Sequence, residues 1–90
     1  GRPGDFVLSQ NYPNPFNPST TLEYSVARVE HVILAVYDIF GREVAVLVNE
    51  RKNPGTYAVF WNATGLASGV YFSRLRAGNE ERAHRMLLVK

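Results

Sequence analysis

Short runs of alternating apolar and polar residues, separated by turn-forming residues, fill the chain from Phe6 onward. A period of two residues is typical of β-strands that bury one face, and no stretch keeps a helical period over three turns. β-branched and aromatic side chains dominate the runs, which favours the same assignment. The pattern predicts strands at residues 6–9, 21–26, 32–38, 43–48, 57–61, 70–76 and 82–89.

This succession of short strands, with turn signals about every 8–12 residues, predicts an all-β fold. The expected architecture is an immunoglobulin-like sandwich of two antiparallel sheets with about seven strands, and a small barrel is the alternative. Gly41 predicts a hairpin turn between Phe40 and Arg42, because glycine readily takes a positive φ. The polar residues 49–55 are expected to form a loop.

Alternate apolar positions assign the expected core of each run. In residues 43–48 the periodicity leaves two alternatives open. Either Val44, Val46 and Val48 point inward, or Ala45 and Leu47 do. The other expected core positions are Phe6, Leu8, Leu22, Tyr24, Val26, Val32, Leu34 and Val36.

A proline-rich stretch at residues 11–20 interrupts the alternation. Its three prolines fix φ near −65° and remove three backbone donors, so the stretch is neither a helix nor a central strand. Residues before proline are pushed toward extended geometry, and asparagine side chains cap local turns. We expect a stiff, extended entry into the β-domain that holds Tyr12 and Phe16 in fixed directions.

Composition and charge exclude several classes of protein. A hydrophobic content of 46% is too high for a disordered tail, and the absence of cysteine excludes disulfides and thiolate chemistry. The net charge of +2 comes from scattered arginines, whereas a nucleic-acid face needs a continuous basic stripe. No apolar run approaches the ~18 residues of a membrane helix. The chain therefore predicts one small domain with no transmembrane segment and no nucleic-acid partner.

The residues that carry catalytic chemistry in other proteins are sparse and unclustered. His31 and His84 belong to no metal-binding motif and are interpreted as surface histidines. Glu80 and Glu81 are adjacent, so they point to different sides and do not face each other across a substrate. No nucleophile motif surrounds Ser68. We expect no catalytic residue, no metal and no cofactor.

The aromatic residues leave a binding function open. Trp61, the single tryptophan, lies in phase with Tyr57 and Val59, which predicts a core position between the sheets rather than a carbohydrate platform. Tyr12, Phe16, Tyr37 and Tyr71 are candidates for a pair that stacks on sugar rings. A carbohydrate- or cell-surface-binding module of a secreted hydrolase is therefore the alternative function, and a passive spacer is a third hypothesis.

The last residues, 86–90, form an apolar strand without a polar tail. At a sheet edge such a strand offers backbone donors and acceptors for strand addition by a partner. The simpler interpretation is that this strand closes the sheet.

Several motifs resemble one known family. The run Asn11-Tyr12-Pro13-Asn14-Pro15-Phe16-Asn17-Pro18-Ser19-Thr20 resembles the opening signature of the type A C-terminal sorting domains of the type IX secretion system. Residues 36–48, 55–61, 66–75 and 86–90 contain further similar motifs. The similarity covers residues 6–90, and the fold is more distantly similar to the immunoglobulin-like domain of flagellar hook-cap proteins.

The resemblance implies a non-catalytic sorting domain at residues 6–90, preceded at residues 1–5 by the linker end of an upstream cargo domain. The cargo is expected to pass the periplasm and to cross the outer membrane through the type IX translocon to the cell surface or medium. A sortase-like peptidase is the second implied partner, with cleavage in or just before residues 1–5. The implied recognition residues are Gly69, Val70, Tyr71, Met86, Leu87, Leu88, Val89 and Lys90.

Overall fold

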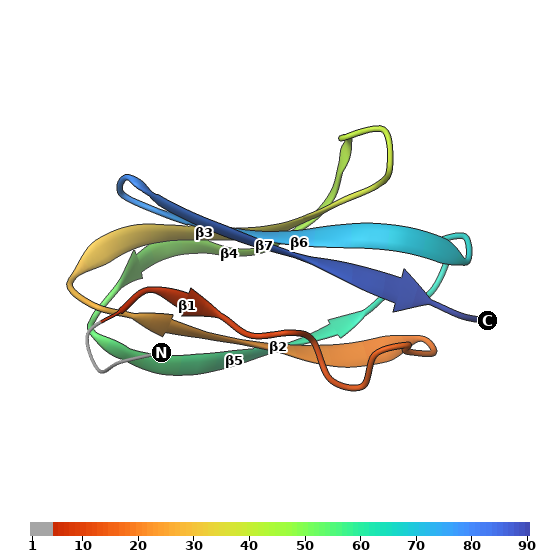
Figure 1. Ribbon diagram of the computed structural model, residues 1–90, viewed down its shortest axis with the longest axis horizontal. Helices are drawn as coiled ribbons and strands as arrows, with labels where there is room; N and C mark the ends of the chain where they lie inside the picture. Colours follow the sequence, from red (N-terminus) through yellow and green to blue (C-terminus); the bar gives the residue numbers. More distant parts are fainter. Residues whose placement is uncertain (1–4) are drawn as a thin grey trace.

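The computed structural model describes residues 5–90, which form two β-sheets packed face to face (Figure 1). One sheet has the order β1-β2-β5 and the other has the order β4-β3-β6-β7, and every pairing is antiparallel. No helix occurs in residues 5–90, so no helix there is long and apolar enough to cross a membrane. The prediction of an all-β sandwich of two antiparallel sheets is confirmed. Its strands are β1 (Val7–Leu8), β2 (Ser19–Val26), β3 (Glu30–Tyr37), β4 (Glu43–Lys52), β5 (Gly55–Asn62), β6 (Gly69–Ala77) and β7 (Glu80–Leu88).

The core lies between the sheets and consists of the inward-facing alternate positions of each strand. All eight core positions expected outside residues 43–48 are buried. Trp61 is buried as well, and Tyr57 and Val59 pack against the core beside it, so the core interpretation of the tryptophan is confirmed. Burial of a large aliphatic or aromatic side chain contributes roughly 1.5–3 kcal/mol, so this set supplies most of the driving force for folding.

Strand β4 is longer than its prediction. It continues through residues 49–52, which pair with residues 30–33 of β3, so the expected loop at residues 49–55 is wrong. Only Asn53 and Pro54 separate β4 from β5. The polar side chains of residues 49–51 resemble a loop in the sequence because β4 is an edge strand, whose side chains there are exposed to solvent.

The phase of β4 follows neither predicted alternation. The register of the β3–β4 pair shifts twice, between Leu34 and Ala35 and between Val36 and Tyr37. Each bulge adds one unpaired residue to the strand and reverses which positions point inward. Val48 is therefore buried at 8% exposure, whereas Val46 is 48% exposed.

The turn predicted around Gly41 is confirmed, and a carboxylate fixes it. Gly41 has a φ of 80°, which residues with a Cβ rarely adopt. The Asp38 side chain accepts hydrogen bonds from the backbone N–H groups of Phe40 at 2.9 Å and Arg42 at 3.0 Å. These bonds hold the β3–β4 hairpin closed at its tip.

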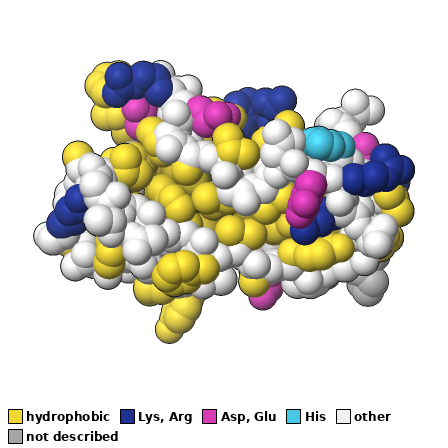
Figure 2. Space-filling view, turned by 180° about the vertical axis from the view of Figure 1, so that it is seen from behind, with side chains coloured by type: hydrophobic (Ala, Val, Ile, Leu, Met, Phe, Trp, Pro, Cys, Tyr) yellow, Lys and Arg dark blue, Asp and Glu magenta, His cyan; other side chains and the backbone are white. Residues whose placement is uncertain are grey.

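The two long sides of the sandwich differ. Strand β7 runs along the side that faces the viewer in Figure 1, and the stretch between β1 and β2 runs along the lower layer beneath it. Strands β4 and β5 are the edge strands of the two sheets on the far side. Figure 2 shows this far side, where hydrophobic side chains gather in a band between the layers.

Candidate functional site

The proline segment, residues 11–20, connects the two sheets. At its start the N–H of Tyr12 donates to the carbonyl of Thr21 at 3.0 Å, and the N–H of Thr21 donates to the carbonyl of Tyr12 at 2.9 Å. Farther along, the N–H of Phe16 donates to Leu87 O and the N–H of Val89 donates to Phe16 O, both at 3.0 Å. Backbone bonds therefore join the start of the segment to β2 and its middle, at Phe16, to the end of β7.

Two buried polar side chains fix the shape of the segment. The amide nitrogen Nδ2 of Asn11 donates to the carbonyl of Pro13 at 3.1 Å and to Oγ1 of Thr20 at 3.0 Å. The Thr20 hydroxyl donates in turn to Pro13 O at 2.8 Å. Buried polar groups are costly unless they are paired, so this network stabilises one conformation. The expected turn-capping role is confirmed for Asn11.

The segment and the preceding residue, Gln10, also occupy the outer edge of β7. Nε2 of Gln10 donates to the carbonyl of Arg85 at 2.7 Å, and Oδ1 of Asn14 accepts the N–H of Leu87 at 2.9 Å. Together with the two Phe16 bonds, these contacts pair the carbonyl of Arg85, both backbone groups of Leu87 and the N–H of Val89. The expectation that this strand offers free edge groups for strand addition is therefore wrong at these positions. The periodicity of the strand contains no sign of a partner more than 70 residues away.

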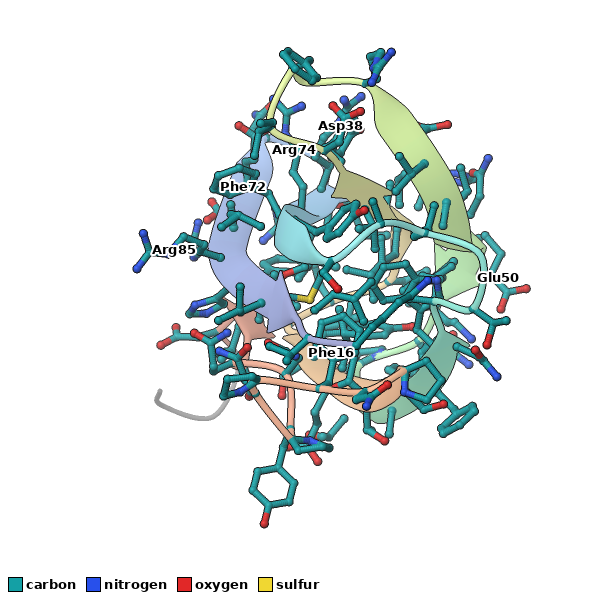
Figure 3. The ribbon with its side chains drawn as sticks, turned by 90° about the vertical axis from the view of Figure 1, so that its right-hand side faces the viewer. Phe16, Asp38, Glu50, Phe72, Arg74 and Arg85 are labelled. Carbon is teal, nitrogen blue, oxygen red and sulfur yellow. The ribbon has the colours of Figure 1, made fainter. Side chains whose placement is uncertain are left out.

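The ring of Phe16 anchors the segment in the core. Phe16 is 2% exposed, and its ring centroid lies 5.6 Å from that of Trp61 (Figure 3). Tyr71 in turn lies 6.4 Å from Trp61 in an edge-on arrangement. Tyr12 behaves differently, because its side chain is 81% exposed. Of the two rings expected to be held in place, only Phe16 packs onto the sandwich.

The eight residues implied as a recognition element divide between the two faces of the four-stranded sheet. Tyr71, Met86 and Leu88 are buried in the core, and the Tyr71 hydroxyl donates to Ala67 O at 2.7 Å. This bond to a carbonyl four residues upstream resembles the tyrosine corner of immunoglobulin-like sandwiches. Only the alternate positions of these two strands can present side chains to a partner. They are Val70, Leu87 and Val89, with Lys90 exposed after them. The eighth residue, Gly69, begins β6 and has no side chain to present.

Phe72 and Arg85 complete the outer face of the strand pair β6–β7. They are register partners, as are Val70 and Leu87, so all four side chains point away from the core on neighbouring strands. Phe72 and Leu87 are each 38% exposed. Sequence reasoning missed Phe72 and Arg85, although the period-two alternation places Phe72 beside Val70 and Arg85 beside Leu87.

Ion pairs surround this outer face. Arg74 Nε lies 2.7 Å from Oε2 of Glu81, and its guanidinium lies 5.4 Å from the ring centroid of Tyr37. The hydrogen bond to Glu81 raises the pKa of Arg74 above its ordinary value. Glu80 pairs separately with Arg82 at 2.9 Å. The two glutamates therefore serve different partners and form no carboxylate pair.

The two histidines form hydrogen bonds with different parts of the sandwich. Nε2 of His31 lies 2.6 Å from Oδ1 of Asn49 on the exposed face. His84 is half-buried, and its Nε2 lies 2.6 Å from the carbonyl of Leu8, so it links β7 to β1 and is not a simple surface residue. Within residues 5–90 no group of three or more His, Cys, Asp or Glu side chains is arranged to hold a metal ion.

The geometry does not present a carbohydrate platform. Tyr71 lies in the core, and Arg74 lies over the ring of Tyr37. Of the four candidate rings, Phe16 is buried as well and Tyr37 is half-buried, so Tyr12 alone is largely exposed and no two of the rings form an open stacking pair. The structure defines instead a small sandwich whose terminal strand presents one apolar outer face and is fastened by a proline segment.

Comparison with known proteins identifies the family. The chain matches the family model described as "Secretion system C-terminal sorting domain" over residues 10–90, and it belongs to that family. The resemblance to sorting domains of the type IX secretion system is thereby confirmed. Members of such a family are exported to the cell surface or medium, which agrees with the expected location. No curated protein matches the chain in sequence.

A solved structure supports the fold. The chain is similar to PorZ of Porphyromonas gingivalis, an essential bacterial surface component of the type-IX secretion system, with a TM-score of 0.64 and 22% sequence identity. The match covers 94% of this chain and 11% of the PorZ chain. At that identity the likeness concerns the fold.

Proposed function

We propose that this chain is a non-catalytic C-terminal sorting signal that directs an attached cargo protein through the outer-membrane type IX translocon. The cargo passes the periplasm, the translocon recognises the folded sandwich, and a sortase-like peptidase then removes it. The predicted linker and cleavage site at residues 1–5 fall largely on residues 1–4, which lie outside the described residues. The domain boundary at residue 6 remains a prediction.

The family match over residues 10–90 carries this proposal. The outer face of β6 and β7 supports the location of recognition, because exposed apolar side chains at a strand pair are typical of protein-binding surfaces. Val70, Leu87 and Val89 are the recognition residues that remain available there, whereas Tyr71, Met86 and Leu88 maintain the shape that presents them.

A fusion of the full chain to a reporter that reaches the periplasm tests this function in a host with a type IX translocon. Deleting residues 86–90 is a poor test, because it removes the buried side chains of Met86 and Leu88 and unfolds the domain. We expect Val70→Ser with Leu87→Ser to lower surface delivery about tenfold, the loss typical of a binding residue worth ~1.4 kcal/mol.

The matched control is Val46→Ser, which changes an exposed valine on the opposite edge of the same sheet. It should leave delivery unchanged. Equal delivery of the reporter with and without the fused chain, or in a host that lacks the translocon, would contradict the proposed function.

A further inference from the structure

The outer face of β6–β7 is an apolar strip with a hollow on each side of Phe72. One hollow, of about 450 Å³, is lined by Asn14, Pro15, Val70, Arg85, Met86 and Leu87. The other, of about 290 Å³, is lined by Tyr37, Asp38, Ile39, Gly41, Phe72, Arg74 and Ala83. The proline segment forms one wall of the first hollow through Asn14 and Pro15. The shape is therefore that of a shallow binding surface on a fixed strand pair.

The positive charge of this strip is only partly neutralised. Arg74 is paired with Glu81, as described above. Arg85 faces Phe72 across the strand pair, and its side chain has no ion pair or hydrogen bond with any other residue of the part of the chain that the structure describes. Figure 3 shows Phe72 and Arg85 on the same side of the molecule, both pointing away from the ribbon. One unpaired guanidinium thus adjoins an exposed aromatic ring and the first hollow.

The Arg85 guanidinium and the apolar side chains around it favour a ligand that has a carboxylate next to apolar groups. A guanidinium binds a carboxylate through two parallel hydrogen bonds, and an apolar surround strengthens that bond. A nucleic acid is a poor fit because it needs a continuous basic stripe. An apolar strip with one free arginine matches an acidic protein segment that lays apolar side chains over Phe72 and Leu87.

We propose that the outer face of β6–β7 binds a segment of the export machinery in which an Asp or Glu side chain pairs with Arg85 and neighbouring apolar side chains cover Phe72 and Leu87. This inference rests on the proposed function and adds the chemistry of the partner. It also assigns Arg85 a direct role that the recognition residues of the family resemblance do not include.

Export of the full-length fusion tests whether the positive charge of Arg85 is needed for recognition. We expect Arg85→Glu to lower surface delivery by about tenfold or more, because it places like charges opposite each other. Arg85→Lys should retain an intermediate level, since lysine keeps the charge but loses the two-fold geometry. The matched control is Arg51→Glu on the edge strand β4 of the same sheet, which reverses an exposed arginine whose side chain has no ion pair or hydrogen bond within residues 5–90.

The identity of the partner is tested by selection of translocon variants that restore export of Arg85→Glu. Restoring changes of Asp or Glu to Lys or Arg support the inference. Export of Arg85→Glu at the level of the unchanged fusion overturns it while the proposed function stands, whereas failure of the unchanged fusion removes the proposed function itself. Loss of export without loss of thermal stability separates recognition from folding.

A membrane surface is the competing source of negative charge. Sedimentation of the purified full chain with phosphatidylglycerol vesicles distinguishes it. We expect no binding to such vesicles. Binding that Arg85→Glu abolishes would identify an anionic lipid as the occupant and would overturn the inference of an acidic protein segment.

Discussion

At the scale of single residues, Phe16 has the largest structural role outside the strands. Its backbone N–H and carbonyl bond to Leu87 and Val89 at the end of β7, and its ring packs beside Trp61. The alternation pattern cannot predict whether the Phe16 ring is buried or exposed, because apolar and polar residues do not alternate in residues 9–18. Only the presence of three prolines indicates that the ring is held.

We expect Phe16→Ala to lower the free energy of unfolding by about 3–5 kcal/mol, because it leaves a cavity between the sheets. Such a loss threatens the stability of a domain of this size. Urea unfolding followed by tryptophan fluorescence measures the effect through the neighbouring Trp61. Tyr12→Ala is the matched control and should change stability by less than about 0.5 kcal/mol, as is usual for exposed positions. Equal losses for the two variants would refute the anchoring role.

At the scale of elements, the strands that pair regularly are predictable and the irregular one is not. Strand β2 follows a strict period of two, so its inward residues can be assigned from the sequence. Strand β4 contains two bulges, and a bulge reverses the phase without leaving a signal in the alternation. The contacts of Asn14 and Gln10 with β7 span 73 and 75 residues, a separation that no local pattern can report.

The β3–β4 hairpin depends on the ionisation of Asp38. Partial desolvation raises the pKa of Asp38, but the hydrogen bonds from Arg42 and Phe40 outweigh it and hold the pKa below the ordinary value of 3.8. Because the folded-state pKa is lowered, the carboxylate stabilises the folded state above its unfolded-state pKa. That contribution is lost as the pH falls from near 3.8 through the lower folded-state pKa.

We therefore expect wild type to be more stable than Asp38→Asn at neutral pH, with the difference shrinking as the pH falls below about 4. Urea unfolding at a series of pH values measures it. Glu23→Gln, on the exposed face of β2, controls for the loss of one carboxylate. A stability difference that is constant between neutral pH and pH ~2 would contradict the role of Asp38 in the turn.

At the scale of the whole molecule, three of the four edge strands are protected from pairing with another chain. Strand β1 is only 2 residues long, β4 carries bulges and charged residues, and the proline segment covers β7. Strand β5 pairs regularly with β2 over all eight of its residues and contains no charged side chain. Long, regular and uncharged edges favour association between chains.

The unprotected edge of β5 is where we expect aggregation between chains to begin. We expect Phe60→Lys to slow aggregation on heating, because Phe60 is 68% exposed on β5 and a charge on an edge strand opposes pairing. Light scattering during a slow temperature ramp measures the onset. Val46→Lys on β4 is the matched control and should have little effect, since that edge is already irregular. A larger effect of Val46→Lys would locate the vulnerable edge on β4.

The bonds between the proline segment and β7 have a consequence for synthesis. The first and last parts of the sandwich depend on each other, so a nascent polypeptide interrupted anywhere before residue 85 leaves Gln10, Asn14 and Phe16 without their bonds to β7. Such a fragment cannot bury Phe16 fully or assemble the face that carries Arg85. The sandwich therefore reaches its complete shape only after residues 85–89 have been synthesised, however early its first strands pair.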